Sequence, residues 1–153
     1  MAVNSYWYAE GLKNILNGNI DVDTSTFKVC LLTNAYNLTN TLLRTHDAYA
    51  DVTTTQITGT NYTAGGVAIT LGAPSVDTTN GGVLIGAAVA NTEWTSATFT
   101  ARYAVIYEAS GTNADMYLMG IVDFGADETC SSGTFTIDWN ATAIFKLTPA
   151  EIT

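Results

Sequence analysis

The chain has 153 residues, 47% of them hydrophobic and only 12% charged, and its 14 acidic residues outnumber its 5 basic ones to give a net charge of −9. This length suits a single domain, 1–153, with a sizeable core. Nucleic-acid binding is disfavoured because no two basic residues are neighbours, and membrane insertion is disfavoured because no apolar run is long enough to span a bilayer.

The N-terminus lacks the basic and apolar regions of a secretory signal, so we expect synthesis in a cytoplasm. Cys30 and Cys130 match no metal-binding spacing and form no C-x-x-C pair, which favours two free thiols in a reducing compartment. No motif for a cofactor or metal is found, and we expect neither.

The first predicted element is a helix that Asn4 or Ser5 caps and that runs to about residue 17. Its apolar residues recur at helical spacing, and Gly18 is placed to end it in a left-handed turn. The segment 26–33, T-F-K-V-C-L-L-T, alternates in the manner of a strand with Phe27, Val29 and Leu31 on one face.

The segment 34–52 is predicted to be a long loop with one possible helical turn at 47–52. Loops of this length in compact domains are usually functional or serve as contact arms. The only histidine, His46, lies here, but a catalytic base needs an adjacent nucleophile and an orienting partner, so a surface or hydrogen-bonded loop histidine is favoured. The candidate partner-contact residues of this loop are Tyr36, Leu38, Leu42, Leu43 and Tyr49.

Further strands are predicted along the rest of the chain, with Asn80-Gly81 as a strong hairpin signal. The segment 97–108 alternates first and then becomes apolar on both faces, which predicts the central strand of a sheet. It carries Arg102, a candidate buried structural charge that needs a partner such as Glu93, Glu108 or Asp123. The other predicted strands are 53–58, 67–71, 83–89, 116–124, 134–139 and 143–147, with a turn at 127–133.

One helix and about eight short strands predict a mainly β fold, an antiparallel β-sandwich or barrel-like domain with one short N-terminal α-helix. The residues also allow two chemical alternatives. A glycosidase would use paired carboxylates drawn from Asp123, Asp127, Glu128 and Asp138, although solvated carboxylates at strand ends are the favoured interpretation. A glycan-binding module would use exposed aromatic side chains such as Tyr36, Tyr49 or Tyr62.

Four stretches carry a family resemblance: Y-T-A-G-G (62–66), A-R-Y-A-V-I-Y (101–107), V-D-F-G (122–125) and S-S-G-T-F-T-I-D-W (131–139). In this order and spacing, the chain resembles a group of small structural proteins from tailed bacteriophages, of the kind found on virion heads. The resemblance covers nearly the whole chain, and its motifs are structural.

The resemblance implies a capsid decoration or cement protein that binds the outer capsid surface, is located in the virion and is made in the host cytoplasm. Its expected partners are the major capsid protein or other virion proteins, and a homo-oligomer is expected. A tail, neck or host-adsorption protein that binds glycans is the alternative. The group offers no catalytic residues, so we expect no enzymatic activity.

Overall fold

The computed structural model describes residues 3–86 and 90–148. A five-stranded antiparallel sheet has the order β1-β7-β6-β2-β3, and a three-stranded sheet has the order β4-β5-β8. In chain order the elements are β1 (Asn4–Trp7), α1 (Ala9–Leu16), β2 (Phe27–Leu32), the 3-10 helix η1 (Asn34–Tyr36), α2 (Asn40–Thr45), the 3-10 helix η2 (Tyr49–Thr55), β3 (Val67–Ile69), β4 (Ser75–Val76), β5 (Val83–Ile85), β6 (Thr92–Glu108), β7 (Leu118–Ile137) and β8 (Phe145–Leu147).

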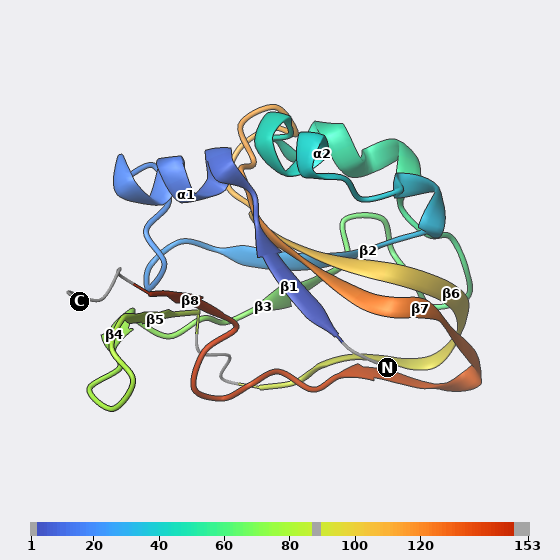
Figure 1. Cartoon of the computed structure of the whole chain (residues 1–153). Coiled ribbons are helices and arrows are strands. Elements are labelled where there is room, and N and C mark those ends of the chain that lie inside the picture. The colour runs from blue at the N-terminus through green and yellow to red at the C-terminus, as the bar shows by residue number, and fades with distance from the viewer. Residues whose placement is uncertain (1–2, 87–89, 149–153) are drawn as a thin grey trace.

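The predicted mainly β, antiparallel fold is confirmed, and the finer expectation of a sandwich or barrel stays a prediction. The helices lie over one face of the five-stranded sheet (Figure 1). The three-stranded sheet lies on the opposite side, together with the far halves of β6 and β7. No helix within the two described ranges is long and apolar enough to cross a membrane.

The pair β6 and β7 forms a long ribbon that curves back under the rest of the sheet (Figure 1). The curve coincides with a break in register: Ala101 pairs with Glu128, whereas Tyr103 pairs with Asp123. One residue of β6 therefore lies opposite four residues of β7, a β-bulge that bends the strand. We call residues 118–123 the first limb of β7 and residues 128–137 its return limb.

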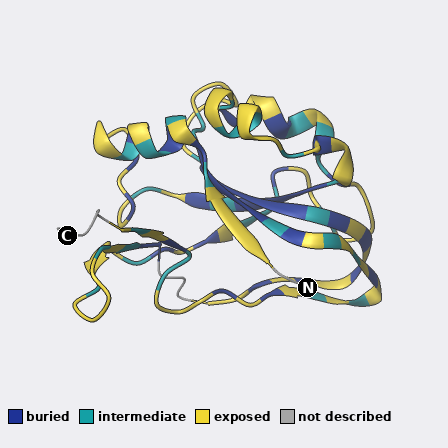
Figure 2. Cartoon of the chain, in the orientation of Figure 1, coloured by how far each residue is buried: buried dark blue, intermediate teal, exposed yellow. Residues whose placement is uncertain are grey.

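Two hydrophobic clusters lie on the two faces of the five-stranded sheet, and β2 contributes to both. Phe27, Val29 and Leu31 face the cluster between the sheet and the return limb. Cys30 and Leu32 face the cluster under the helices. The two faces predicted for this strand are therefore confirmed. Because one of the two clusters covers each face, burial is greatest along the middle strands of the sheet (Figure 2).

The central position predicted for 97–108 is confirmed, since β6 is the third of five strands and its residues 103–108 are all buried. The strand begins earlier than expected, at Thr92. The hairpin signal at Asn80-Gly81 is also confirmed by the antiparallel pairing of β4 with β5. Part of the predicted strand 83–89 lies outside the described residues, at 87–89.

The N-terminal prediction was partly wrong. Residues 4–7 form strand β1, paired with β7 from Asn4 opposite Asp123 to Trp7 opposite Gly120, and the helix begins only at Ala9. Helical spacing in residues 4–17 cannot reveal an unpaired strand edge elsewhere in the chain. Residues 4–7 form a strand because they pair with the edge of β7, whose backbone groups a helix at this place would leave without partners. The left-handed conformation expected of Gly18 is confirmed.

Three further predictions need correction. The segment 34–52 is more ordered than a loop, since it contains α2, η1 and the start of η2. The segment 53–58 forms no named strand, because η2 extends to Thr55 and only Gln56 makes a β-bridge, to Leu32. The turn expected at 127–133 is absent: β7 continues through these polar residues because β6 supplies a pairing partner along most of them.

Candidate functional site

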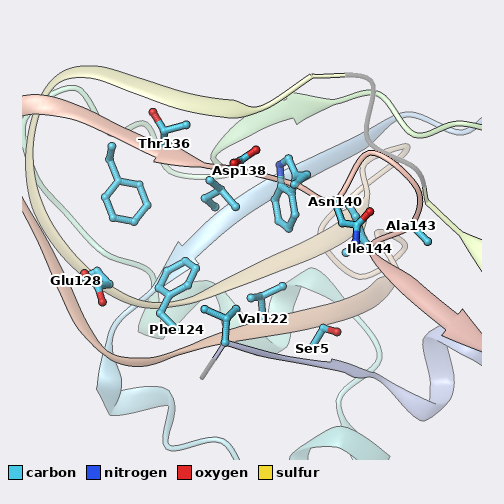
Figure 3. A pocket seen from close by; sticks show the side chains of 13 residues that line it. Ser5, Val122, Phe124, Glu128, Thr136, Asp138, Asn140, Ala143 and Ile144 are labelled. Atoms are coloured by element: carbon cyan, nitrogen blue, oxygen red, sulfur yellow. The ribbon is translucent and has the colours of Figure 1, made fainter. Parts of the chain in front are cut away.

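A cleft of about 490 Å³ lies between β1 and the two limbs of β7 (Figure 3). Its lining comes from the chain around β1, from both limbs of β7 and from the loop that leads to β8. The lining residues are Val3, Ser5, Val122, Phe124, Glu128, Phe135, Thr136, Ile137, Asp138, Trp139, Asn140, Ala143 and Ile144.

The walls of this cleft are part of the hydrophobic core. Val122 and Phe124 come from the first limb and the bulge, and Ile137 and Trp139 from the end of the return limb and just beyond it; all four are buried members of the cluster between the layers. The Trp139 indole Nε1 donates a hydrogen bond to Thr92 Oγ1 at 2.7 Å. This bond fixes the ring, so the apolar wall is formed before any ligand arrives.

The polar groups of the cleft are acidic or neutral. Glu128 is half-buried and, in Figure 3, lies at the end of the cleft near Phe124. Asp138 also contributes to the lining, and no lysine or arginine does. The cleft therefore combines an apolar interior with a negative potential, which is strengthened by the net charge of −9.

One side of the cleft is bounded by an open sheet edge. Within the described residues, β1 pairs only with β7. The Tyr8 N–H donates to the Met119 carbonyl at 3.2 Å. Because bonded and non-bonded pairs alternate along an antiparallel ladder, Tyr6 and Asn4 also direct their backbone groups to β7, and the N–H and C=O of Ser5 point away from it.

Two of the residues predicted to contact a partner are core residues instead. Tyr36 and Tyr49 are 5% and 7% exposed, so their expected role as exposed aromatic side chains was wrong. The Tyr36 hydroxyl lies 2.9 Å from that of Tyr8 and 3.0 Å from His46 Nδ1. Burial raises the pKa of Tyr36 to about 12, so it remains a neutral hydrogen-bonding group.

The other three predicted contact residues are neither fully buried nor fully exposed. Leu38, Leu42 and Leu43 are half-buried and pack against the cluster under the helices. They attach α2 and its preceding loop to the sheet, which leaves only their outer surfaces to a partner. The favoured interpretation of His46 is confirmed, since it is half-buried and hydrogen-bonded to Tyr36.

The expectation that Arg102 has an acidic partner is confirmed, although the guanidinium is half-buried rather than buried. Arg102 Nε donates to Asp123 Oδ1 at 2.8 Å, with 26% and 20% of the two side chains exposed. The Gly125 N–H also donates to Asp123 Oδ1, at 2.8 Å. These bonds hold the bulge where the β6–β7 ribbon turns, and therefore position Phe124 and Glu128 in the cleft.

Burial alone would raise the pKa of Asp123, but the hydrogen bonds from Arg102 and Gly125 outweigh it and hold the pKa below its ordinary value of 3.8. A carboxyl group whose pKa is lower in the folded state stabilises the fold above its unfolded pKa, and this contribution is lost as the pH falls through the folded value. Asp123 therefore contributes fully above about pH 4 and progressively less below it.

We expect Asp123→Asn to lower the free energy of unfolding by about 1 kcal/mol at pH 7. The difference from the wild type should shrink below about pH 4, where the wild-type carboxyl becomes protonated. Urea denaturation at several pH values measures both effects. Asp138→Asn is the control, since Asp138 is exposed; equal losses in the two variants would contradict a role for the ion pair.

The remaining candidate residues are the two cysteines and the acidic residues. Both cysteines are free, as predicted, and burial raises the pKa of Cys30 to about 12, which suppresses its reactivity. Asp127 accepts a hydrogen bond from Asn34 Nδ2 at 2.9 Å, outside the cleft. No group of three potential metal ligands occurs among the described residues. Of the four acidic candidates, only Glu128 and Asp138 line the cleft.

The sequence reasoning missed the open edge at β1, although a signal was present. Residues 3–7 read Val-Asn-Ser-Tyr-Trp, and the adjacent aromatic residues Tyr6 and Trp7 favour a strand over a helix. Comparison with models of known protein families, with curated proteins and with solved structures found no match to this chain.

Proposed function

We propose that this chain is a structural protein of a bacteriophage virion that acts as a capsid decoration or cement protein. Its partners on this proposal are the major capsid protein or other virion proteins, and its role is contact rather than catalysis. The proposal starts from the sequence resemblance and is supported by one feature of the surface, the exposure of large apolar side chains on the β4–β5 hairpin and along the edge at β1.

This feature is clearest on the β4–β5 hairpin. Val76 and Val83 are directly opposite each other in the ladder, and they are 70% and 37% exposed. Val3 and Tyr6, at the open edge of the other sheet, are 63% and 39% exposed. Exposed apolar residues grouped on a hairpin or along an unpaired strand edge are typical of surfaces that bind other proteins. Repetition of such small contacts over a capsid lattice would strengthen each one through multivalency.

The buried state of Tyr36 and Tyr49 weakens the glycan-binding alternative in its original form. Tyr62 is half-buried, and its hydroxyl lies 3.1 Å from Gln56 Oε1 and 3.0 Å from the Leu31 backbone nitrogen. These rings are engaged inside the protein, so they do not form a stacking platform for sugars. A structural role at the neck or tail does not depend on these rings, so the neck or tail remains the alternative location in the virion for a protein that binds other virion proteins.

Electron cryomicroscopy of the source virion tests the proposal. We expect copies of this fold on the outer capsid surface, with the β4–β5 hairpin at a subunit contact. Virions assembled with Val76→Lys should carry fewer copies, whereas Leu16→Lys, at a 75% exposed site away from the hairpin, should not change their number. A head without copies would refute the decoration role, and copies confined to the neck or tail would support the alternative.

A further inference from the structure

We propose that the cleft beside β1 binds an extended segment of a partner protein, which adds to the open edge of β1 as a further strand. The segment carries apolar side chains that enter the cleft and basic residues that reach Glu128. The inference rests on the proposed contact function and deepens it, because it names the surface and the chemistry of the partner.

The backbone of β1 supplies the first part of the recognition. The N–H and C=O groups of Ser5 point away from β7, as the alternation of the ladder requires. Residues 3–6 are exposed, which leaves this edge accessible (Figure 2). An extended segment can pair with these groups without any rearrangement of the sheet, which is the geometry of β-strand addition.

The cleft supplies the second part. Ser5 is opposite Val122 in the ladder, and both side chains line the cleft (Figure 3). Side chains of an added strand alternate between the two faces of the sheet, so every second one would enter the cleft. There it would meet Val3 at the mouth and the fixed wall of Phe124 and Trp139. This wall selects aliphatic or aromatic side chains at alternate positions.

Charge identifies the class of occupant. The lining includes Glu128 and Asp138 and no basic residue, within a chain of net charge −9. A second copy of the chain would bring the same excess of negative charge and be repelled, whereas a basic segment would be attracted. The partner segment is therefore apolar at alternate positions and rich in lysine or arginine at one end.

We take the added strand to be antiparallel to β1, as every pairing between the named strands of this protein is. Asn4 is opposite Asp123, and Glu128 lies beyond that pair, past the N-terminal end of β1. A strand added antiparallel to β1 brings its own C-terminal end to this place. The basic residues of the segment should therefore follow its apolar residues in sequence.

Synthetic peptides test these requirements with the purified full-length protein. The probe is an N-terminally fluorescein-labelled peptide of sequence Thr-Val-Thr-Val-Thr-Val-Lys-Lys amide, and its matched control ends in Glu-Glu. Fluorescence anisotropy measures the binding of each. We expect saturable binding of the lysine peptide with Kd below about 1 mM, and binding of the glutamate peptide at least about tenfold weaker.

Variants locate the binding to the cleft. Glu128→Lys should weaken binding of the lysine peptide about tenfold and strengthen binding of the glutamate peptide. The reason is that the substitution reverses the sign of the charge that faces the end of each peptide. Val3→Ser should weaken the binding of both peptides, because it removes an apolar contact from the cleft without adding charge, and it alters a residue that is 63% exposed. The matched controls Asp23→Lys, for the charge change, and Leu16→Ser, for the loss of an exposed apolar side chain, lie outside the cleft and should alter Kd less than about twofold.

Each outcome decides the inference. The inference is supported if binding is weakened in the two cleft variants only and their circular dichroism spectra show that they are folded. Absence of binding by either peptide, equal binding of both, or equal losses in cleft and control variants overturns it. These results are independent of the virion images: copies on the capsid with no peptide binding would refute this inference alone, and peptide binding with no copies on the virion would refute the virion role alone.

Discussion

Replacing Gly66 by alanine is expected to lower the free energy of unfolding by about 2–5 kcal/mol. Gly66 has a φ of +69°, and a Cβ atom built there would lie 1.8 Å from the Val29 carbonyl oxygen of β2. The new methyl group therefore adds overpacking against a strand backbone to the cost of a left-handed conformation. The carbonyl is part of the sheet, so it cannot move without disturbing the pairing of β2 with β3.

The matched control for this variant is Gly81→Ala. Gly81 has nearly the same φ, +70°, but no atom lies within 4 Å of its Cβ position. Only the conformational cost of about 1–2 kcal/mol applies there. Urea denaturation followed by circular dichroism measures both variants, and a loss at Gly66 no larger than that at Gly81 would show that the close approach to β2 has no energetic weight.

Truncating Phe145 to alanine is expected to cost about 3–5 kcal/mol. Phe145 lies on β8 and is 4% exposed. Its ring centroid is 4.4 Å from that of Trp7, and a Cβ added to Gly120 would lie 2.2 Å from its Cζ. The ring therefore joins the three-stranded sheet to β1 and β7, and its removal leaves a cavity between them.

Val83→Ala on the paired strand β5 is the control for Phe145→Ala, because Val83 is 37% exposed and should lose at most about 0.5 kcal/mol. A double-mutant cycle makes the test sharper. Gly120→Ala should be destabilising with Phe145 present and less so with Phe145→Leu, whose shorter side chain leaves room for the new methyl group. Additive losses in this cycle would contradict direct packing of the ring on Gly120.

Much of the strand content of this chain could be predicted because it depends on local patterns. The alternation in 26–33 and the doubly apolar half of 97–108 identify β2 and β6 and their buried faces. The partner of Arg102 was included among the candidates because a half-buried or buried charge needs compensation. The choice of Asp123 over the other acids depended on strand register, which no local pattern contains.

The errors occurred where pairing with a distant strand overrides local preference. Residues 4–7 and 127–133 carry helix and turn signals, yet both are strands because β7 and β6, respectively, offer backbone partners. Tyr36 and Tyr49 belong to a polar segment, yet both are buried because η1 and η2 pack onto the sheet. Their exposure could not be judged without knowing what lies beneath them.

By itself, the sequence determined that this protein is acidic, poor in charge, mainly β and built around the strand that carries Arg102. These properties follow from composition and from the period of the side chains along the chain. Only the tertiary structure decided where a partner could bind. The cleft requires the bulge at Asp123 to fold β7 back on itself, and its accessible side requires the outer edge of β1, which has no strand partner within residues 3–86 and 90–148. Both depend on contacts between residues far apart in the chain, which a local sequence pattern does not specify.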